Sequence, residues 1–172
     1  MKNYCHLCGA KYSQGKSQPW ECSGCGNLSF SNSVPCAEIA LFDSCGRVLL
    51  AVRANDPNKG KFDLPGGFLV HGEELITGLY RELNEELGLT SSDIETPQFC
   101  SSWVMDYPFS KESLNTLTLT FTAKLKTTKE IIARDDVSEI RFFELEKLDS
   151  VDFSYSGYPA LIRKAHKLIF KH

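Results

Sequence analysis

Hydrophobic and polar positions divide the chain into two parts near residue 33. Residues 1 to about 33 are rich in Cys, Gly, Ser and Gln and hold few aliphatic side chains, so they cannot bury a core of their own. From residue 34 onward, apolar runs of strand length alternate with polar segments and with two stretches of helical periodicity. The pattern predicts a small N-terminal module, residues 1–33, followed by one larger domain, residues 34–172.

The apolar runs of the larger domain are short, as in a β-sheet. The run LTLTFTAKL, residues 117–125, alternates apolar and polar side chains, which is the period of a strand with one buried face. We expect strands over residues 35–43, 47–54, 97–105, 116–126 and 140–145. Pro65, Gly66 and Gly67 predict a tight turn. Strands interspersed with two helices indicate a mixed sheet covered by helices.

Two stretches repeat apolar residues at the three- and four-residue spacing of a helix. We expect the first helix to begin near Glu73, with Glu73 and Glu74 in its first turn, and to end at Gly88, a suitable left-handed cap. Its apolar stripe consists of Leu75, Ile76, Leu79, Tyr80, Leu83 and Leu87. The second stretch, YPALIRKAHKLIF over residues 158–170, predicts a C-terminal amphipathic helix.

Three carboxylates crowd one face of the first predicted helix. Glu82, Glu85 and Glu86 project to the same side because residues three and four apart are neighbours on a helix. Such like charges repel by about 0.2–0.5 kcal/mol per pair, and they lie near the end where the helix dipole disfavours anions. A solvent-exposed charged face is the common explanation of such a cluster. The alternative is a compensating cation, of which a divalent metal is the simplest candidate.

Composition and charge exclude several classes of protein. The chain has 172 residues, 42% hydrophobic and 24% charged, as in a globular domain. Its net charge of -3 provides no basic field for nucleic acid or an anionic membrane. Apolar runs fall short of the ~20 residues of a membrane span, and the first ten residues, MKNYCHLCGA, lack the apolar core of a secretory signal. We therefore expect a cytoplasmic protein with reduced cysteines.

The N-terminal module carries a duplicated Cys-x-x-Cys-Gly turn. The two copies are CHLCG and CSGCG, and their thiols belong to Cys5, Cys8, Cys22 and Cys25. Four thiolates on two tight turns match the tetrahedral preference of structural zinc, and the glycine after each pair allows a positive φ. A redox-active Cys-x-x-Cys is the alternative, but it requires a thioredoxin-like setting. The spacing therefore predicts a zinc ribbon whose metal stabilises the module.

The stretch from residue 67 to residue 89, GFLVHGEELITGLYRELNEELGL, resembles the signature of the Nudix hydrolases, G-x5-E-x7-R-E-U-x-E-E-x-G-U, where U is aliphatic. The specified positions are Gly67, Glu73, Arg81, Glu82, Leu83, Glu85, Glu86, Gly88 and Leu89. The resemblance implies an α/β fold: the Nudix α/β/α sandwich with a mixed β-sheet, here preceded by a small zinc ribbon. It also implies hydrolysis of a nucleoside diphosphate linked to another moiety, with Mg²⁺ or Mn²⁺.

The same resemblance implies roles for individual residues. Glu82, Glu85 and Glu86, with the carbonyl of Gly67, would hold the divalent ions. Arg81 would orient a carboxylate, that of Glu82 or Glu73, and either Glu82 or a later acid would serve as the base. Several relatives place a further metal-binding or catalytic glutamate where this chain has Glu139; a solvated loop acid is the alternative reading.

A zinc ribbon ahead of a Nudix domain is similar to the NADH pyrophosphatase branch, which also removes NAD caps from RNA. That branch carries a Ser-Gln-Pro-Trp-Pro-Phe-Pro element, whereas this chain has the interrupted version SSWVMDYPFS over residues 101–110. Trp103, Tyr107 and Phe109 could stack on a base or simply pack in the protein. The candidate substrates are thus NAD(H), ADP-ribose and similar compounds, with NAD-capped RNA an unlikely one.

A second functional hypothesis makes the protein a binding module. In it, the Nudix domain senses a nucleotide with little catalysis, and the zinc ribbon touches RNA or protein. A third assigns the ribbon a purely structural role or a contact in a homodimer. Metal-dependent turnover of a small-molecule nucleotide distinguishes the enzyme from the binding module.

Overall fold

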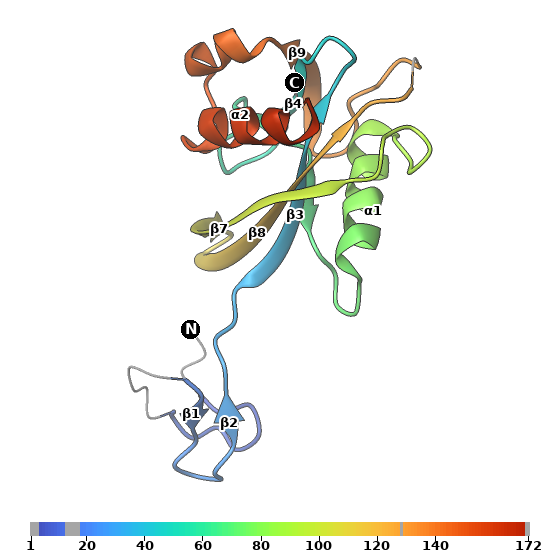
Figure 1. Cartoon of the computed structure of the whole chain (residues 1–172). Coiled ribbons are helices and arrows are strands. Elements are labelled where there is room, and N and C mark those ends of the chain that lie inside the picture. Colours follow the sequence, from blue (N-terminus) through green and yellow to red (C-terminus); the bar gives the residue numbers. More distant parts are fainter. Residues whose placement is uncertain (1–3, 13–17, 128, 171–172) are drawn as a thin grey trace. The chain divides into compact units, whose positions relative to one another are not determined.

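The computed structural model describes residues 4–12, 18–127 and 129–170 of the chain (Figure 1). The chain divides into two compact units, residues 1–33 and 34–172, each of which is described by itself. Within the described residues, no helix is long and apolar enough to cross a membrane.

The smaller unit is held together by a few buried side chains. Strand β1 (Trp20–Glu21) pairs antiparallel with β2 (Leu28–Ser29). Among the described residues, the buried hydrophobic side chains of this unit are Cys5, Tyr12, Trp20 and Cys22. Two of these four residues, Cys5 and Cys22, are predicted metal ligands. The cysteine cluster is therefore part of the packed interior of this unit.

In the described part of the larger unit, seven strands form one mixed sheet in the order β5-β4-β3-β8-β7, with β6 beside β3 and β9 beside β4. The strands are β3 (Val34–Phe42), β4 (Val48–Arg53), β5 (Phe62–Asp63), β6 (Gly66–Phe68), β7 (Gln98–Phe109), β8 (Glu112–Lys124) and β9 (Val137–Phe143). Strand β3 runs parallel to β8, and the other pairings are antiparallel.

Strand β3 is buried on both faces, and each face meets a different helix. Ile39 and Leu41 pack in one core with α1 (Leu75–Leu87), whereas Ala40 and Phe42 pack in a second core with α2 (Tyr158–Ile169). A short 3₁₀ helix, η1 (Leu145–Ser150), contributes Leu148 to the second core. The arrangement confirms the expected α/β/α layers around a mixed sheet (Figure 1).

Helix α1 begins two residues later than expected. Glu74 is its N-cap with extended backbone angles, so Glu73 and Glu74 both precede the first turn, and that turn holds no acid. The carboxylate of Glu73 instead accepts hydrogen bonds from Arg81 and from the backbone N–H of Val70. At the other end, Gly88 adopts φ 66° and caps the helix as expected.

Two other expectations about the backbone were wrong. Gly66 and Gly67 do not form a tight turn but belong to β6, which pairs with β3 over residues 36–38. Strand β7 continues to Phe109 instead of ending at residue 105, because it forms a long hairpin with β8. A strand of two or three residues such as β6 is too short to show the alternation of apolar and polar side chains. Such a strand is recognised only by its hydrogen bonds to a partner strand.

Candidate active site and candidate zinc site

The glycines of β6 allow two elements to approach closely. A side chain at Gly66 would place its Cβ 2.2 Å from the carbonyl oxygen of Ala37 on β3. A Cβ at Gly67 would lie 2.7 Å from the carboxylate of Glu82 on α1. Gly66 therefore requires glycine, whereas a side chain at Gly67 would displace the carboxylate of Glu82; together the two glycines bring the Gly67 backbone against the glutamate face of the helix.

Arg81 binds several carboxylates of the glutamate cluster. Its guanidinium donates two hydrogen bonds to Glu73, at 2.8 and 2.9 Å, and one each to Glu82 at 2.8 Å and Glu85 at 2.9 Å. The Arg81 hydrogen bonds and the backbone N–H of Val70 lower the pKa of Glu73 to about 2. The guanidinium of Arg81 thus offsets part of the repulsion among the glutamates, which was the reason for expecting a metal. Arg81 also contacts both of the carboxylates that it was expected to orient, those of Glu73 and Glu82.

Glu86 differs from the other glutamates in its surroundings. Its side chain is only 8% exposed, and one carboxylate oxygen accepts a hydrogen bond of 2.9 Å from the backbone N–H of Gly66. Burial raises the pKa of Glu86 to about 8. Among the described residues, Glu86 forms no ion pair with a basic side chain. Burial also raises the pKa of Glu82, despite its contact with Arg81.

The oxygen donors at this place fit a divalent cation. A buried carboxylate without a basic partner costs free energy when ionised, and a cation bound beside it removes that cost. Glu86, Glu82 and the Gly67 backbone supply the hard oxygen ligands that Mg²⁺ and Mn²⁺ prefer, and Glu85 lies on the same helix face. The donor set therefore suits the ion that the signature implies.

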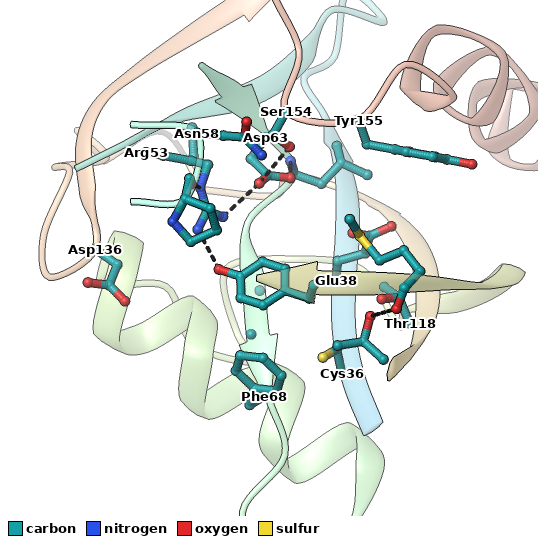
Figure 2. A pocket seen from close by; sticks show the side chains of 18 of the residues that line it. Cys36, Glu38, Arg53, Asn58, Asp63, Phe68, Thr118, Asp136, Ser154 and Tyr155 are labelled. Atoms are coloured by element: carbon teal, nitrogen blue, oxygen red, sulfur yellow. Dashed lines mark hydrogen bonds and ion pairs between the residues drawn. The ribbon is translucent and has the colours of Figure 1, made fainter. Parts of the chain in front are cut away.

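A cavity of about 370 Å³ opens next to the β6 glycines (Figure 2). Gly66, Gly67 and Glu86 lie on its wall, so the cavity is continuous with the glutamate site. Strand β7 forms another part of the wall through the side chains of alternate residues, Trp103, Met105, Tyr107 and Phe109. This volume lies in the range of small-molecule binding sites.

All three aromatic residues that the sequence singled out line the cavity, and each has a partner in the protein. Trp103 stacks on Tyr155, with ring centroids 4.2 Å apart. The hydroxyl of Tyr107 accepts a hydrogen bond of 2.8 Å from Arg53. Phe109 is 51% exposed and meets Phe68 edge-on at 6.0 Å. These three aromatic side chains thus pack against other residues of the protein, and they also face a cavity.

A buried polar network at the cavity wall was missed by the sequence analysis. The hydroxyl of Tyr158 lies within hydrogen-bonding distance of both Glu38, at 2.9 Å, and Asp63. A phenol has one hydrogen to donate, and the carboxyl groups of Glu38 and Asp63 both lie in position to accept it. Burial, together with the nearby charge of Asp63, raises the pKa of Glu38 to about 7. Glu38 was detectable as the single acid within the apolar run CAEIALF.

Glu139 lies away from the cavity. It is in β9, exposed, and pairs with Arg141, which lowers the pKa of Glu139. The acid of this region that does line the cavity is Asp136, which accepts a hydrogen bond of 2.6 Å from the side chain of Asn55. Glu139 is not among the residues that line the cavity, and its role in metal binding or catalysis stays a prediction.

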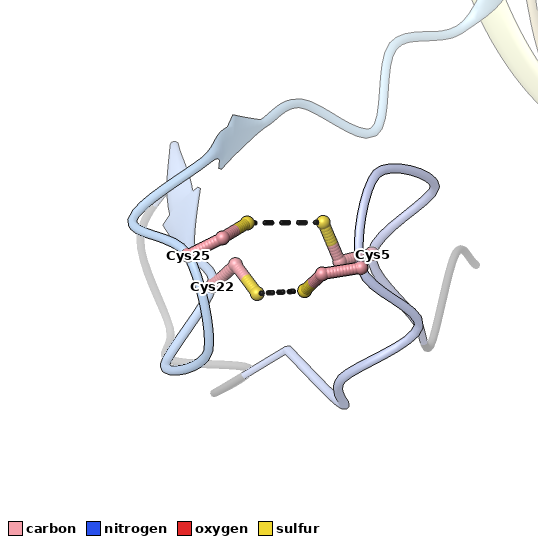
Figure 3. Close-up of side chains that lie close together, drawn as sticks. Cys5, Cys22 and Cys25 are labelled. Atoms are coloured by element: carbon pink, nitrogen blue, oxygen red, sulfur yellow. Dashed lines mark hydrogen bonds between the residues drawn. The ribbon is translucent and has the colours of Figure 1, made fainter.

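The four cysteines of the smaller unit converge. Their Sγ atoms all lie within 4.8 Å of one another, with Cys5 to Cys25 at 3.7 Å and Cys8 to Cys22 at 3.5 Å (Figure 3). These separations match the edge of a tetrahedron of sulfurs at ~2.3 Å from zinc, which is about 3.8 Å. The cysteine set therefore fits the expected ion.

The two cysteine turns have the same backbone structure. The N–H of Gly9 bonds the carbonyl of Cys5 at 2.9 Å, and the N–H of Gly26 bonds that of Cys22 at 2.8 Å. Both glycines have positive φ, at 75° and 71°, as the repeat predicted. The duplicated sequence thus folds into a duplicated turn.

The α/β/α layers, the glycine strand and the glutamate helix together define the Nudix class of protein. The family model described as the NUDIX domain matches residues 33–163. This match covers most of the chain, so the chain belongs to the Nudix family.

Relatives and solved structures of this family are similar to the chain over different lengths. An ADP-ribose pyrophosphatase of Methanocaldococcus jannaschii is 30% identical over 115 residues, 67% of this chain and 64% of that protein. An RNA pyrophosphohydrolase of Saccharophagus degradans is 37% identical over 70 residues, 41% of this chain and 40% of that protein. The match thus spans less than two thirds of each of these curated relatives. The crystal structure of a NUDIX hydrolase from Nitrosomonas europaea aligns with a TM-score of 0.70 at 21% identity, covering 97% of this chain and 92% of that one.

Proposed function

We propose that this protein is a pyrophosphohydrolase that cleaves the diphosphate of a nucleoside diphosphate derivative, with ADP-ribose and NAD(H) as the first candidates. One observation carries the proposal. Glu86 is a buried carboxylate without a basic partner in the described structure, and it lies near Glu82 and beside Gly66 on the wall of a cavity. Such a group is suited to hold a cation next to a bound ligand.

In this proposal, Glu82, Glu85, Glu86 and the carbonyl of Gly67 hold Mg²⁺ or Mn²⁺. The ion would polarise a phosphoryl oxygen and lower the pKa of the attacking water. Arg81 keeps the carboxylates of Glu73, Glu82 and Glu85 in place through charge-assisted hydrogen bonds. Arg81 and Glu73 are therefore positioning residues.

The base that accepts the proton of the attacking water is either Glu82 or a later acid. Burial raises the pKa of Glu82, which improves its capacity to accept a proton near neutral pH. Among the later acids, Asp136 lines the cavity, whereas Glu139 lies outside it and pairs with Arg141. The positions favour Glu82 or Asp136 over Glu139.

The substrate class follows from the cavity and from the relatives. A cavity with aromatic walls beside a phosphate-binding metal site suits a nucleotide whose base or sugar enters the cavity. The printed name of the Methanocaldococcus relative is ADP-ribose pyrophosphatase, and this compound is therefore the first to be tested. We place the enzyme in the cytoplasm, with residues 1–33 as a zinc ribbon whose four thiolates bind one structural Zn²⁺.

The test is a hydrolysis assay of ADP-ribose, NAD⁺, NADH and 5′-triphosphorylated RNA with Mg²⁺ or Mn²⁺. We expect turnover of at least one diphosphate compound, and a loss of about 10²-fold or more in Glu86→Gln. The matched control is Glu146→Gln, which removes an exposed carboxylate. Failure of every compound to react, or equal rates in the two variants, would contradict the proposal and favour a nucleotide-sensing module. Thermal melting of each variant separates lost chemistry from unfolding.

A further inference from the structure

The cavity has an unusual balance of charged side chains. Among its lining residues, all of which the structure describes, Arg53 is the one basic side chain. The acidic side chains on the wall are Glu38, Asp56, Asp63, Glu86 and Asp136. A ligand group that enters this cavity therefore meets five acids and a single cation.

The charge of Arg53 is already used within the protein. Its guanidinium donates to the carboxylate of Asp63 at 2.9 Å, to the carbonyl of Pro57 at 2.7 Å and to the hydroxyl of Tyr107 at 2.8 Å (Figure 2). The ion pair with Asp63 is largely withdrawn from water, since the two side chains are 25% and 15% exposed. A phosphate brought to Arg53 would have to compete with this carboxylate.

The other acidic side chains of the cavity lack a basic partner that could attract a negatively charged ligand group. Glu38 is enclosed by its bonds to Thr120, Trp103 and Tyr158 and offers the ligand no cation. Asp136 and Asp56 line the cavity from loops next to β9 and β4, and neither has a basic partner among the described residues. Apart from Glu86, which we assign to the metal, the free charges of the cavity are thus negative.

The aromatic side chains of the cavity suit an uncharged planar group. Phe68 follows Gly67 directly in β6, and its ring meets Tyr107 at 5.7 Å and Phe109 at 6.0 Å, both edge-on. Edge-on packing leaves ring faces on which a base can stack. All three rings line the cavity, on which Gly67 and Glu86 of the proposed metal site also lie.

We propose that the cavity binds the base and ribose of a nucleoside with a free 2′-hydroxyl, and that its negative lining rejects a phosphate on that ribose. The inference rests on the proposed function and refines it. Asp56, Asp136 and the Arg53–Asp63 pair are then specificity-determining residues. They distinguish unphosphorylated dinucleotides from their 2′-phosphorylated counterparts, which carry ~1.5–2 more negative charges.

The test compares two substrate pairs that differ by one phosphate: NADH with NADPH, and ADP-ribose with ADP-ribose 2′-phosphate. We expect kcat/KM to be about tenfold or more lower for the phosphorylated member of whichever pair reacts, mainly through KM. Met105→Lys adds a cation inside the cavity and should reduce this discrimination several-fold. Met105→Gln, without the charge, should preserve it.

Val104→Lys is the matched control because Val104 neighbours Met105 in β7 but is 62% exposed on the opposite face. Equal kcat/KM within a pair, or equal effects of Val104→Lys and Met105→Lys, would overturn the inference. Calorimetric binding of ADP-ribose and its 2′-phosphate without added divalent metal tests it independently of turnover: tighter binding of ADP-ribose supports the inference, and equal affinities refute it. Failure of both unphosphorylated compounds to be hydrolysed would refute only the proposed function.

Discussion

At the scale of single residues, two of the buried acids in the larger unit, Glu86 and Glu38, have different environments. Glu86 lies beside a backbone N–H at the proposed metal site, whereas Glu38 bonds Thr120, Trp103 and Tyr158. The signature located Glu86, but the network of Glu38 could not be predicted, because Tyr158 is 120 residues away in the chain. Local patterns carry no information on such pairs.

The protonation of Glu38 predicts a pH-dependent stability. Burial raises the pKa of Glu38 from 4.5 to about 7 in the folded protein, so the folded state binds the proton more tightly than the unfolded state. The resulting stabilisation is complete below pH ~4.5 and is lost as the pH rises through about 7. Glu38→Gln retains a donor towards Tyr158 and cannot ionise. We expect its free energy of unfolding, relative to wild type, to increase by up to about 3 kcal/mol between pH 5 and pH 8.

Urea unfolding at pH 5, 6, 7 and 8 measures this difference. Comparing Glu38→Gln with wild type cancels the contribution of Glu86, whose pKa is also raised by burial. A difference that stays constant over the pH range would show that Glu38 is ionised in the folded protein.

At the scale of elements, the long strands and helices follow from periodicity, and the short strands do not. Strands β3 and β8 and helix α1 carry enough periodic positions to be predicted within a few residues. Strands β5 and β6 exist because β4 and β3 supply their hydrogen-bonding partners. The site depends on β6 more than on any of the predicted strands, since β6 places Gly67 against Glu82.

The close approach of β6 to β3 predicts that Gly66→Ala is strongly destabilising. Gly66 has φ 139°, and a Cβ there would lie 2.2 Å from the carbonyl oxygen of Ala37. We expect a loss of about 2–4 kcal/mol in the free energy of unfolding, from strained backbone and overlap together. Gly72→Ala is the matched control: Gly72 also has a positive φ, 81°, but its Cβ would meet nothing within 4 Å.

Chemical denaturation of both variants provides the measurement. The control should lose only ~1 kcal/mol, the cost of an unfavourable φ alone. Equal losses in Gly66→Ala and Gly72→Ala would mean that backbone strain, and not the contact with β3, accounts for the requirement for glycine.

At the scale of the whole molecule, the chain joins a Nudix domain to a small unit whose interior includes cysteine side chains. The boundary between them was visible as a change in composition near residue 33, because a short segment with few aliphatic residues cannot fold on hydrophobic burial alone. The roles of the two units with respect to each other could not be deduced from either pattern.

The cysteine cluster predicts one zinc ion per chain. Elemental analysis of the purified protein should find it, and Cys22→Ser should lose it, because three thiolates bind zinc less tightly than four. Cys45→Ser is the control, since Cys45 is exposed and lies outside the cluster. Zinc retained in Cys22→Ser and lost in Cys45→Ser would contradict the assignment of the ligands.

The central claim is that the glutamate face of α1 binds a divalent metal. Titration of Mn²⁺ into wild type and Glu86→Gln, followed by electron paramagnetic resonance of the free ion, tests it most directly. We expect a saturable site in wild type, an affinity about tenfold or more lower in Glu86→Gln, and an unchanged affinity in Glu146→Gln. Equal Mn²⁺ affinity in all three folded proteins would contradict it.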